Sequence, residues 1–122
     1  MEFLTTTPIL DWILNTPCKD LFSPAAADDV RPNVVPLIVC ADGATLSVQA
    51  SRTHYCRPRD CYGPWHTVEV GYPSVAVPEW AAHKDQDKNA DTDTVFAYVP
   101  VELVRAFITA HGGENQVLNH TA

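Results

Sequence analysis

Apolar and polar residues alternate most clearly in two stretches of the chain, residues 44–50 and 66–72, and this predicts strands with one buried face. Two mainly apolar runs, residues 34–41 and 94–99, predict two further strands. Asp42-Gly43 separates the first run from the first alternating stretch, which is typical of a two-residue hairpin turn. The side chains expected on the buried face are Leu46, Val48, Ala50, Val68, Val70 and Tyr72.

Two helices flank these strands in the sequence. Residues 8–15 predict a short helix, with Thr7 as its N-cap and Pro8 at the first helical position. A second helix is expected to begin at Pro100 and to stop at Gly112-Gly113. The side chains at helical spacing that we expect in the core are Val101, Val104, Phe107, Ile108 and His111.

The order of these elements predicts an α+β fold, a small antiparallel β-sheet with helices packed on one side. We expect residues 1–33 to form an N-terminal helical extension and linker, because the prolines after the first helix favour a loop. Residues 34–122 are expected to form a single α+β ligand-binding domain. Residues 81–93 read as a polar excursion, and the tail from Glu114 is expected to be loosely ordered.

The overall charge narrows the classes of partner. The chain has 122 residues and a net charge of −7, which argues against binding a long nucleic acid polymer. It has no apolar run of the roughly 20 residues that a membrane span needs, and Met1 to Leu4 lack the basic segment of a signal peptide. We therefore expect a soluble, cytosolic protein that contacts no membrane, with free thiols at its four cysteines and no cofactor.

A local positive patch stands out against this acidic background. Residues 51–59 hold three of the chain's eight Lys and Arg residues, with the rings of His54 and Tyr55 between them. Guanidinium groups bind phosphates through paired, charge-assisted hydrogen bonds and also stack on bases. A small anionic ligand is one interpretation, and a solvated loop or an ion-pair network is the other.

Further residues could serve such a ligand. Arg105 adds a guanidinium on the outer face of the second helix. Stacking faces could come from Tyr55, Trp80, Phe96 and Tyr98, and hydroxyl or amide contacts from Gln49, Ser51 and Asn89. Several of these have a simpler explanation, since Trp80 and Phe96 fit core positions and Arg105 fits a solvated surface.

Two other chemistries were weighed and are not expected. The side chains of His54, Cys56, Cys61 and His66 are of the types that bind zinc, but their spacing lacks the C-x2-C knuckle of a structural zinc site, so we expect no metal. Cys56 could be combined with a histidine and Asp60 as a nucleophile, base and orienting group. No flanking motif of a known enzyme class accompanies them, so no catalytic residues are expected.

Several short phrases, in fixed order, carry a family resemblance. They are Ala41-Asp42-Gly43, Ser47-Val48-Gln49-Ala50-Ser51, His54-Tyr55-Cys56, Val68-Glu69-Val70-Gly71-Tyr72-Pro73-Ser74, Val99-Pro100-Val101-Glu102 and His111-Gly112-Gly113. From about Ile38 to Gly113 the chain resembles the phage-encoded Thoeris anti-defence proteins of the first type. The motifs do not cover the 33 residues before Val34.

The resemblance implies a non-enzymatic sponge in the host cytoplasm. Proteins of this family sequester a cyclic ADP-ribose isomer made by a bacterial TIR-domain defence enzyme; they are oligomers with pockets between subunits, and some also bind cyclic oligonucleotides at a second site. For this chain it suggests Arg105 for phosphate or base contact, Trp80 as a stacking face and Asn89 as an amide reader. The 51–59 loop would serve the same pocket from a neighbouring subunit, or a separate site. Its candidate ligand-binding residues are Ser51, Arg52, His54, Arg57 and Arg59.

Two alternatives remain open from the sequence. The net charge and the acidic stretch 85–93 suit a protein that blocks a host defence enzyme by direct contact. A small zinc-stapled interaction domain is the other alternative, based on the same histidines and cysteines as above.

Overall fold

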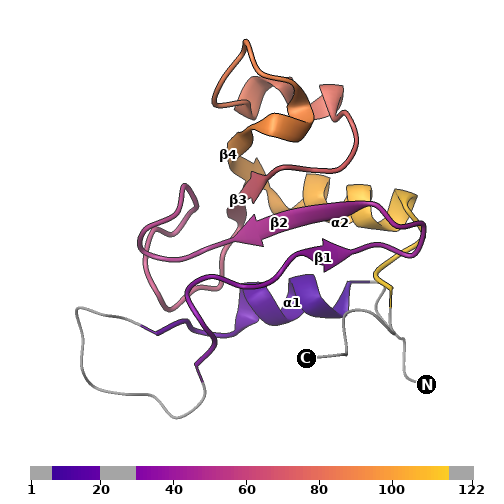
Figure 1. The fold of residues 1–122 in the computed structure, drawn as a ribbon. Coiled ribbons are helices and arrows are strands. Elements are labelled where there is room, and N and C mark those ends of the chain that lie inside the picture. Colours follow the sequence, from indigo (N-terminus) through magenta and orange to yellow (C-terminus); the bar gives the residue numbers. More distant parts are fainter. Residues whose placement is uncertain (1–6, 20–29, 116–122) are drawn as a thin grey trace.

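A four-stranded antiparallel sheet forms the centre of the computed structural model, which describes residues 7–19 and 30–115 (Figure 1). Its strands follow one another in the sheet as they do in the chain, so each is joined to its neighbour without a crossover. The strands are β1 (Ile38–Val39), β2 (Thr45–Gln49), β3 (Thr67–Gly71) and β4 (Val95–Pro100). The helices are α1 (Pro8–Asn15) and α2 (Val101–Ala110), with two 3₁₀ helices, η1 (Pro78–His83) and η2 (Asp91–Asp93). The α+β prediction is confirmed.

One hydrophobic core joins both helices to the sheet. The alternation of β2 and β3 buries Leu46, Val48, Val68 and Val70 completely, as predicted. The buried side chains that the helices add are Leu10, Ile13, Leu14, Val104, Phe107 and Ile108. Tyr72 was expected beside Val70 but is 56% exposed, because its backbone turns left-handed (φ 49°) and leaves the alternation of the strand.

The hairpin between β1 and β2 is confirmed, but its turn is longer than predicted. The Cys40 N–H donates to the Ala44 carbonyl at 2.7 Å and the Gly43 N–H donates to the Cys40 carbonyl at 3.0 Å, so three residues form the loop. Gly43 has a φ of 95°, and it supplies the left-handed residue that a three-residue hairpin loop requires. Gly therefore fits the position, although the loop begins one residue earlier.

Strand β1 is much shorter than the predicted run 34–41. Pro36 has no N–H to give to a ladder, and the segment before β1 is held by a side chain instead. The Gln49 amide accepts a hydrogen bond from the Val35 N–H and donates one to the Val35 carbonyl, both at 2.9 Å. The backbone pairing that the apolar run suggested is thus replaced by one buried glutamine.

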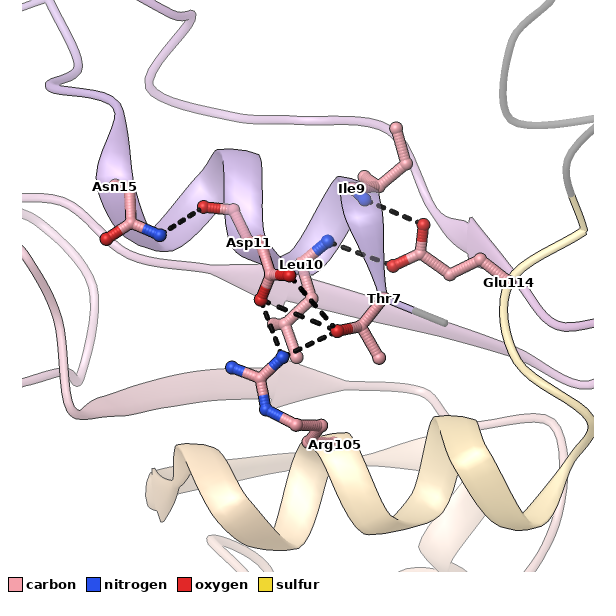
Figure 2. Close-up of polar contacts among 7 residues, drawn as sticks. All are labelled: Thr7, Ile9, Leu10, Asp11, Asn15, Arg105 and Glu114. Atoms are coloured by element: carbon pink, nitrogen blue, oxygen red, sulfur yellow. Dashed lines mark hydrogen bonds and ion pairs between the residues drawn. The ribbon is translucent and has the colours of Figure 1, made fainter. Parts of the chain in front are cut away.

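The N-terminus of α1 is capped from the other end of the chain. The Glu114 carboxylate accepts hydrogen bonds from the backbone N–H groups of Ile9 (2.7 Å) and Leu10 (2.9 Å), as Figure 2 shows. Thr7 occupies the predicted N-cap position, but its hydroxyl makes no capping bond and contacts Asp11 instead. The prediction of a loosely ordered tail from Glu114 is wrong at that residue, which is 4% exposed. Residues 116–122 lie outside the described part of the chain.

Helix α2 follows β4 directly, with Pro100 as the last residue of the strand. The Val101 N–H donates to the His66 carbonyl at 3.0 Å, which fixes the start of the helix against the residue before β3. The helix ends as predicted at Gly112 and Gly113, which have φ values of 90° and 85°. The Gly113 N–H donates back to the Ile108 carbonyl at 2.9 Å, a bond that is typical of a glycine-terminated helix.

A buried arginine ties the region before β1 to the same core. Arg31 is 2% exposed, and its guanidinium donates to the carbonyls of Ile13 (3.1 Å) and Ala50 (2.7 Å). Its Cζ also lies 4.9 Å from the centroid of the Trp65 ring. α1 and Arg31 pack into the same core as the sheet. Described residues on both sides of the predicted boundary between residues 33 and 34 therefore share one hydrophobic core. Residues 1–6 and 20–29 of the predicted extension lie outside the described part of the chain.

Within residues 7–19 and 30–115, no helix combines the length and apolar character that crossing a membrane would require.

Candidate functional site

Two arginines and two tyrosines form a row on the protein surface, which we name the arginine–tyrosine row: Arg59, Tyr55, Tyr98 and Arg57. The Arg59 Cζ lies 5.4 Å from the Tyr55 ring centroid, and the Arg57 Cζ lies 4.9 Å from the Tyr98 ring centroid. The two tyrosine rings are 6.0 Å apart and tilted by 45°. Each cation therefore rests on an aromatic face, and the two faces adjoin.

Tyr98 reaches this row through an irregularity in β4. The pairing of β3 with β4 shifts between Val68 and Val70, so that β4 has an extra residue there. Tyr98 lies at this bulge with a left-handed backbone (φ 54°), an unfavourable conformation for a large side chain. Its N–H donates to the Tyr55 carbonyl at 3.1 Å, which joins β4 to the 51–59 loop. Strain of this kind is often retained at functional sites.

The 51–59 loop is also fixed to the start of β3. The Arg57 N–H donates to the Thr67 carbonyl at 3.2 Å, and the His66 N–H donates to the Arg57 carbonyl at 2.9 Å. The Tyr55 N–H donates to the Glu69 carboxylate at 3.3 Å. The row is therefore held by backbone pairing on two sides, although Tyr55, Arg57 and Arg59 are exposed and Tyr98 is half-buried.

Ser51, His54 and Cys56 form the inner side of this loop. The Ser51 hydroxyl lies 2.6 Å from His54 Nδ1, and the Cys56 thiol donates to the Ser51 carbonyl at 3.1 Å. Burial lowers the pKa of His54, with Arg31 and Arg59 adding to the effect and Glu69 opposing it. Burial likewise raises the pKa of the Cys56 thiol. The Ser51 hydroxyl and His54 Nδ1 share a hydrogen bond, so this group supports the loop from inside.

The arrangement can hold an anion, and the Ser51 hydroxyl and the Cys56 thiol of the same loop are buried. Arg57, Arg59 and Tyr55 are exposed, whereas Ser51 and Cys56 are completely buried. Guanidinium groups resting on rings keep their N–H edges available for phosphate or carboxylate oxygens. A ligand on the row would meet cationic N–H donors and aromatic faces, while the Ser51 hydroxyl and Cys56 thiol face the interior.

Trp80 does not provide the stacking face expected from the sequence. Its side chain is completely buried on η1, 5.7 Å from the Phe96 ring and 5.4 Å from the Phe107 ring. The indole fills the space between β4 and α2, so Trp80 is a residue of the hydrophobic core. In the folded single chain, a ligand has no access to it.

Arg105 likewise has a structural partner. It donates to the Asp11 carboxylate at 2.6 Å and to the Thr7 hydroxyl at 2.5 Å, so it joins α2 to α1 (Figure 2). Its side chain is 42% exposed, so it lies at the surface as expected, but its guanidinium reaches across from α2 to the first turn of α1. This position is separate from the arginine–tyrosine row.

Asn89 is exposed, but it lies at the far end of the sheet from the row. The 51–59 loop precedes the first residue of β3, whereas the excursion that carries Asn89 follows its last residue (Figure 1). The Asn89 amide donates to the Asp93 carbonyl at 3.2 Å within its own turn. A single chain therefore does not bring Asn89 together with Arg57 and Arg59.

Arg52, the remaining predicted contact, is half-buried at the start of the loop. Two of the four residues in the row, Tyr55 and Tyr98, are absent from the predicted ligand contacts, although both were considered as stacking faces. For Tyr55 the available signal was its spacing of two and four residues from Arg57 and Arg59. For Tyr98 no local signal existed, because the register of β4 determines its position.

The four candidate zinc ligands do not converge. Among the described residues, no group of three or more His, Cys, Asp or Glu side chains is arranged to hold a metal ion. Cys61 is directed to the Lys19 carbonyl at 3.8 Å, and Cys56 to backbone carbonyls of its own loop. The thiols thus have separate hydrogen-bond acceptors.

Comparisons of this chain with protein-family models, with curated proteins and with solved structures found no match.

Proposed function

We propose that this protein binds an anionic nucleotide at the arginine–tyrosine row and sequesters it without cleaving it. The observation that carries the proposal is the row itself, in which two guanidinium groups rest on two adjoining tyrosine rings. A pyrophosphate needs charge-assisted donors and an adenine needs an aromatic face, and the row places both on one surface.

The family resemblance directs the choice of ligand. It points to a cyclic ADP-ribose isomer, which has one pyrophosphate and one adenine, as the sequestered signal of TIR-dependent Thoeris immunity. The burial of Ser51 and Cys56 supports retention of the ligand intact, since neither side chain can reach a ligand on the row without local opening. We propose the host cytoplasm as the site of action, with cyclic oligonucleotides as further ligands.

Self-association is part of the same proposal. The resemblance implies pockets between subunits, and Asn89 lies far from the row within one chain. A neighbouring copy could place its Asn89, or its Arg105 edge, beside the row. An oligomer would then combine predicted contacts that a single chain separates.

Calorimetry with cyclic ADP-ribose isomers tests the binding step, and mass spectrometry of a heat extract of the loaded protein tests sequestration. We expect saturable binding and recovery of the intact nucleotide. No heat of binding would contradict the proposed ligand class, and recovery of linear ADP-ribose would identify an enzyme instead.

Direct inhibition of a defence enzyme is the second candidate, because the excursion exposes Asp85, Asp87 and Asp93. Co-purification of the chain with a TIR-domain enzyme in the absence of nucleotide would favour this function.

A further inference from the structure

Cys18 and Cys61 lie side by side where the segment after α1 passes the loop before β3. The Cys18 N–H donates to the Cys61 carbonyl at 2.8 Å, and the Cys61 side chain is close enough to raise the pKa of the Cys18 thiol. Their exposed fractions are 3% and 1%. Residues joined by a backbone hydrogen bond have Cα atoms within the range that a disulfide spans.

The other two cysteines are occupied elsewhere. Cys56 donates its thiol to the carbonyls of Ser51 (3.1 Å) and Pro58 (3.4 Å) within its own loop. Cys40 belongs to the β1–β2 turn, where its backbone pairs with Ala44. Of the four thiols, Cys18 and Cys61 are therefore the pair set for a crosslink.

We propose that Cys18 and Cys61 are an oxidation site at which a small disulfide, such as oxidised glutathione, converts the two thiols into an intramolecular disulfide. One thiolate attacks glutathione disulfide, which breaks its S–S bond, forms a mixed disulfide and releases one reduced glutathione. The second thiolate then attacks the protein sulfur of the mixed disulfide and releases the other. The two cysteines lose two electrons and two protons, and two reduced glutathione molecules carry them away.

The surroundings of the pair determine how fast this happens. Burial raises the pKa of Cys18 to about 12, with Cys61 adding to the effect and the nearby Arg31 opposing it. The thiolate of Cys18 is therefore scarce near neutral pH, and the crosslink should form slowly there and faster as pH rises. The pair should also react faster when local opening admits the oxidant.

The crosslink would have a structural consequence beyond nucleotide binding. It would join the segment after α1 covalently to the loop that lies between the arginine–tyrosine row and β3. The enclosed segment contains β1, β2 and three residues of the row (Tyr55, Arg57 and Arg59), so the unfolded chain would lose much of its conformational freedom. The oxidised protein should therefore be more stable, whether or not a nucleotide is bound.

The test uses the full chain, oxidised with glutathione disulfide at about pH 8 to raise the thiolate fraction, then unfolded and treated with N-ethylmaleimide. We expect intact mass spectrometry to show two alkylated cysteines and a loss of two hydrogens, and a digest to contain a Cys18–Cys61 linked peptide. The melting temperature should rise by roughly 10 °C and return when dithiothreitol is added.

Three outcomes would overturn the proposal: alkylation of all four cysteines, a stable glutathione adduct at either residue without a crosslink, or a linkage that includes Cys40 or Cys56. Cys40→Ser is the matched control and should keep the rise in melting temperature, whereas Cys61→Ser should lose it. The peptide map of the unsubstituted chain decides the question even if a variant fails to fold.

Discussion

Arg105 on α2 and Asp11 on α1 form an ion pair of 2.6 Å between helices that lie at opposite ends of the chain. The family resemblance suggested Arg105 as a ligand contact, but its geometry gives it a role in holding α1. The same guanidinium also donates to Thr7, whose side chain is otherwise buried. Because Arg105 contacts Asp11 and Thr7, substitutions at these residues can separate its contribution to folding from any contribution to binding.

Arg105→Ala should lower the free energy of unfolding by about 1 kcal/mol, because the ion pair is partly exposed and the Thr7 hydroxyl loses a charged donor. Urea denaturation measures this change. In a double-mutant cycle, Asp11→Ala should cost little more once Arg105 is gone. If Arg105 has only the contacts seen in the single chain, Arg105→Ala should bind nucleotide within about twofold of the unsubstituted protein, because the substitution changes folding stability and leaves the row intact. A large loss of affinity in a folded variant would instead place Arg105 in an intersubunit pocket.

Glu114→Ala should destabilise the protein by about 1–2 kcal/mol, because the N–H groups of Ile9 and Leu10 lose a charged cap. Glu114→Gln should cost less, since its amide oxygen still accepts one of these bonds. Hydrogen exchange at the two amides should accelerate in both variants. Asp87→Asn is the matched control, because it removes one negative charge from an exposed turn. Equal protection of the Ile9 and Leu10 amides in the two Glu114 variants and in the Asp87→Asn control would contradict the cap.

Arg57→Ala and Arg59→Ala should each weaken binding of cyclic ADP-ribose isomers by roughly 10-fold or more, as expected when a charge-assisted phosphate contact is removed. Tyr55→Phe should bind nearly as well as the unsubstituted protein, because the ring face is kept, whereas Tyr55→Ala should bind more weakly. Lys88→Ala removes a positive charge from the exposed excursion and serves as the control. Calorimetry at two salt concentrations measures all of these variants. Affinity that survives both arginine substitutions would exclude the row as the site.

Tyr98→Asn should separate stability from binding. Asn adopts a left-handed backbone more readily than Tyr, so the variant recovers roughly 1 kcal/mol of strain while losing the contacts of the ring. We expect nearly unchanged thermal stability and greatly weakened nucleotide binding. Tyr72→Asn is the matched control, because Tyr72 has a similar φ (49°) and is exposed away from the row. It should gain stability and keep affinity; a loss of affinity there would show that the row is not the binding surface.

Lowering the pH should destabilise the protein through His54. Because burial lowers its pKa from the ordinary value of 6.5, the unfolded chain takes up a proton before the folded one does. The contribution of His54 is therefore complete above pH 6.5, and it is lost progressively as the pH falls from there through the folded pKa. Urea denaturation across this range should show the slope, and His54→Gln should reduce it.

Asp42 and Asp91 should make the stability of the protein depend on pH in a lower range than His54 does. Backbone N–H groups lower the pKa of each carboxyl, that of Ala44 for Asp42 and that of Val77 for Asp91, with His111 and Lys84 as smaller contributors. Since the folded pKa values lie below 3.8, the stability they provide is present above that pH and is lost as the pH falls through them.

Local chemistry in the sequence predicted those parts of the fold that depend on neighbouring residues. Pro8 starts α1, Gly113 ends α2, and Gly43 takes the left-handed position of the hairpin. Tyr72 and the length of the hairpin loop differ from the prediction for local backbone reasons, whereas two other features depend on partners distant in sequence. The cap of α1 comes from Glu114, and the rings around Trp80 come from β4 and α2. Neither contact can be read from the spacing of apolar and polar residues near α1 or Trp80.

The candidate site divides in the same way. Its arginines were visible in the sequence because they cluster in one loop of an acidic chain. The arrangement of their rings was not, because it depends on the bulge that brings Tyr98 to Tyr55. Trp80 and Arg105 have residue types suited to a ligand, but tertiary contacts direct Trp80 into the core and Arg105 to α1.

The cap on α1 also bears on how the chain is made. Ile9 leaves the ribosome 105 positions before Glu114, so α1 emerges without its acceptor and the whole sheet is synthesised in between. At about 5–20 residues per second, that interval lasts several seconds. An isolated helix of this length is marginal in water, so α1 gains its full stability only when the C-terminal strand and helix arrive. The first helix of this protein is therefore among the last elements to be completed.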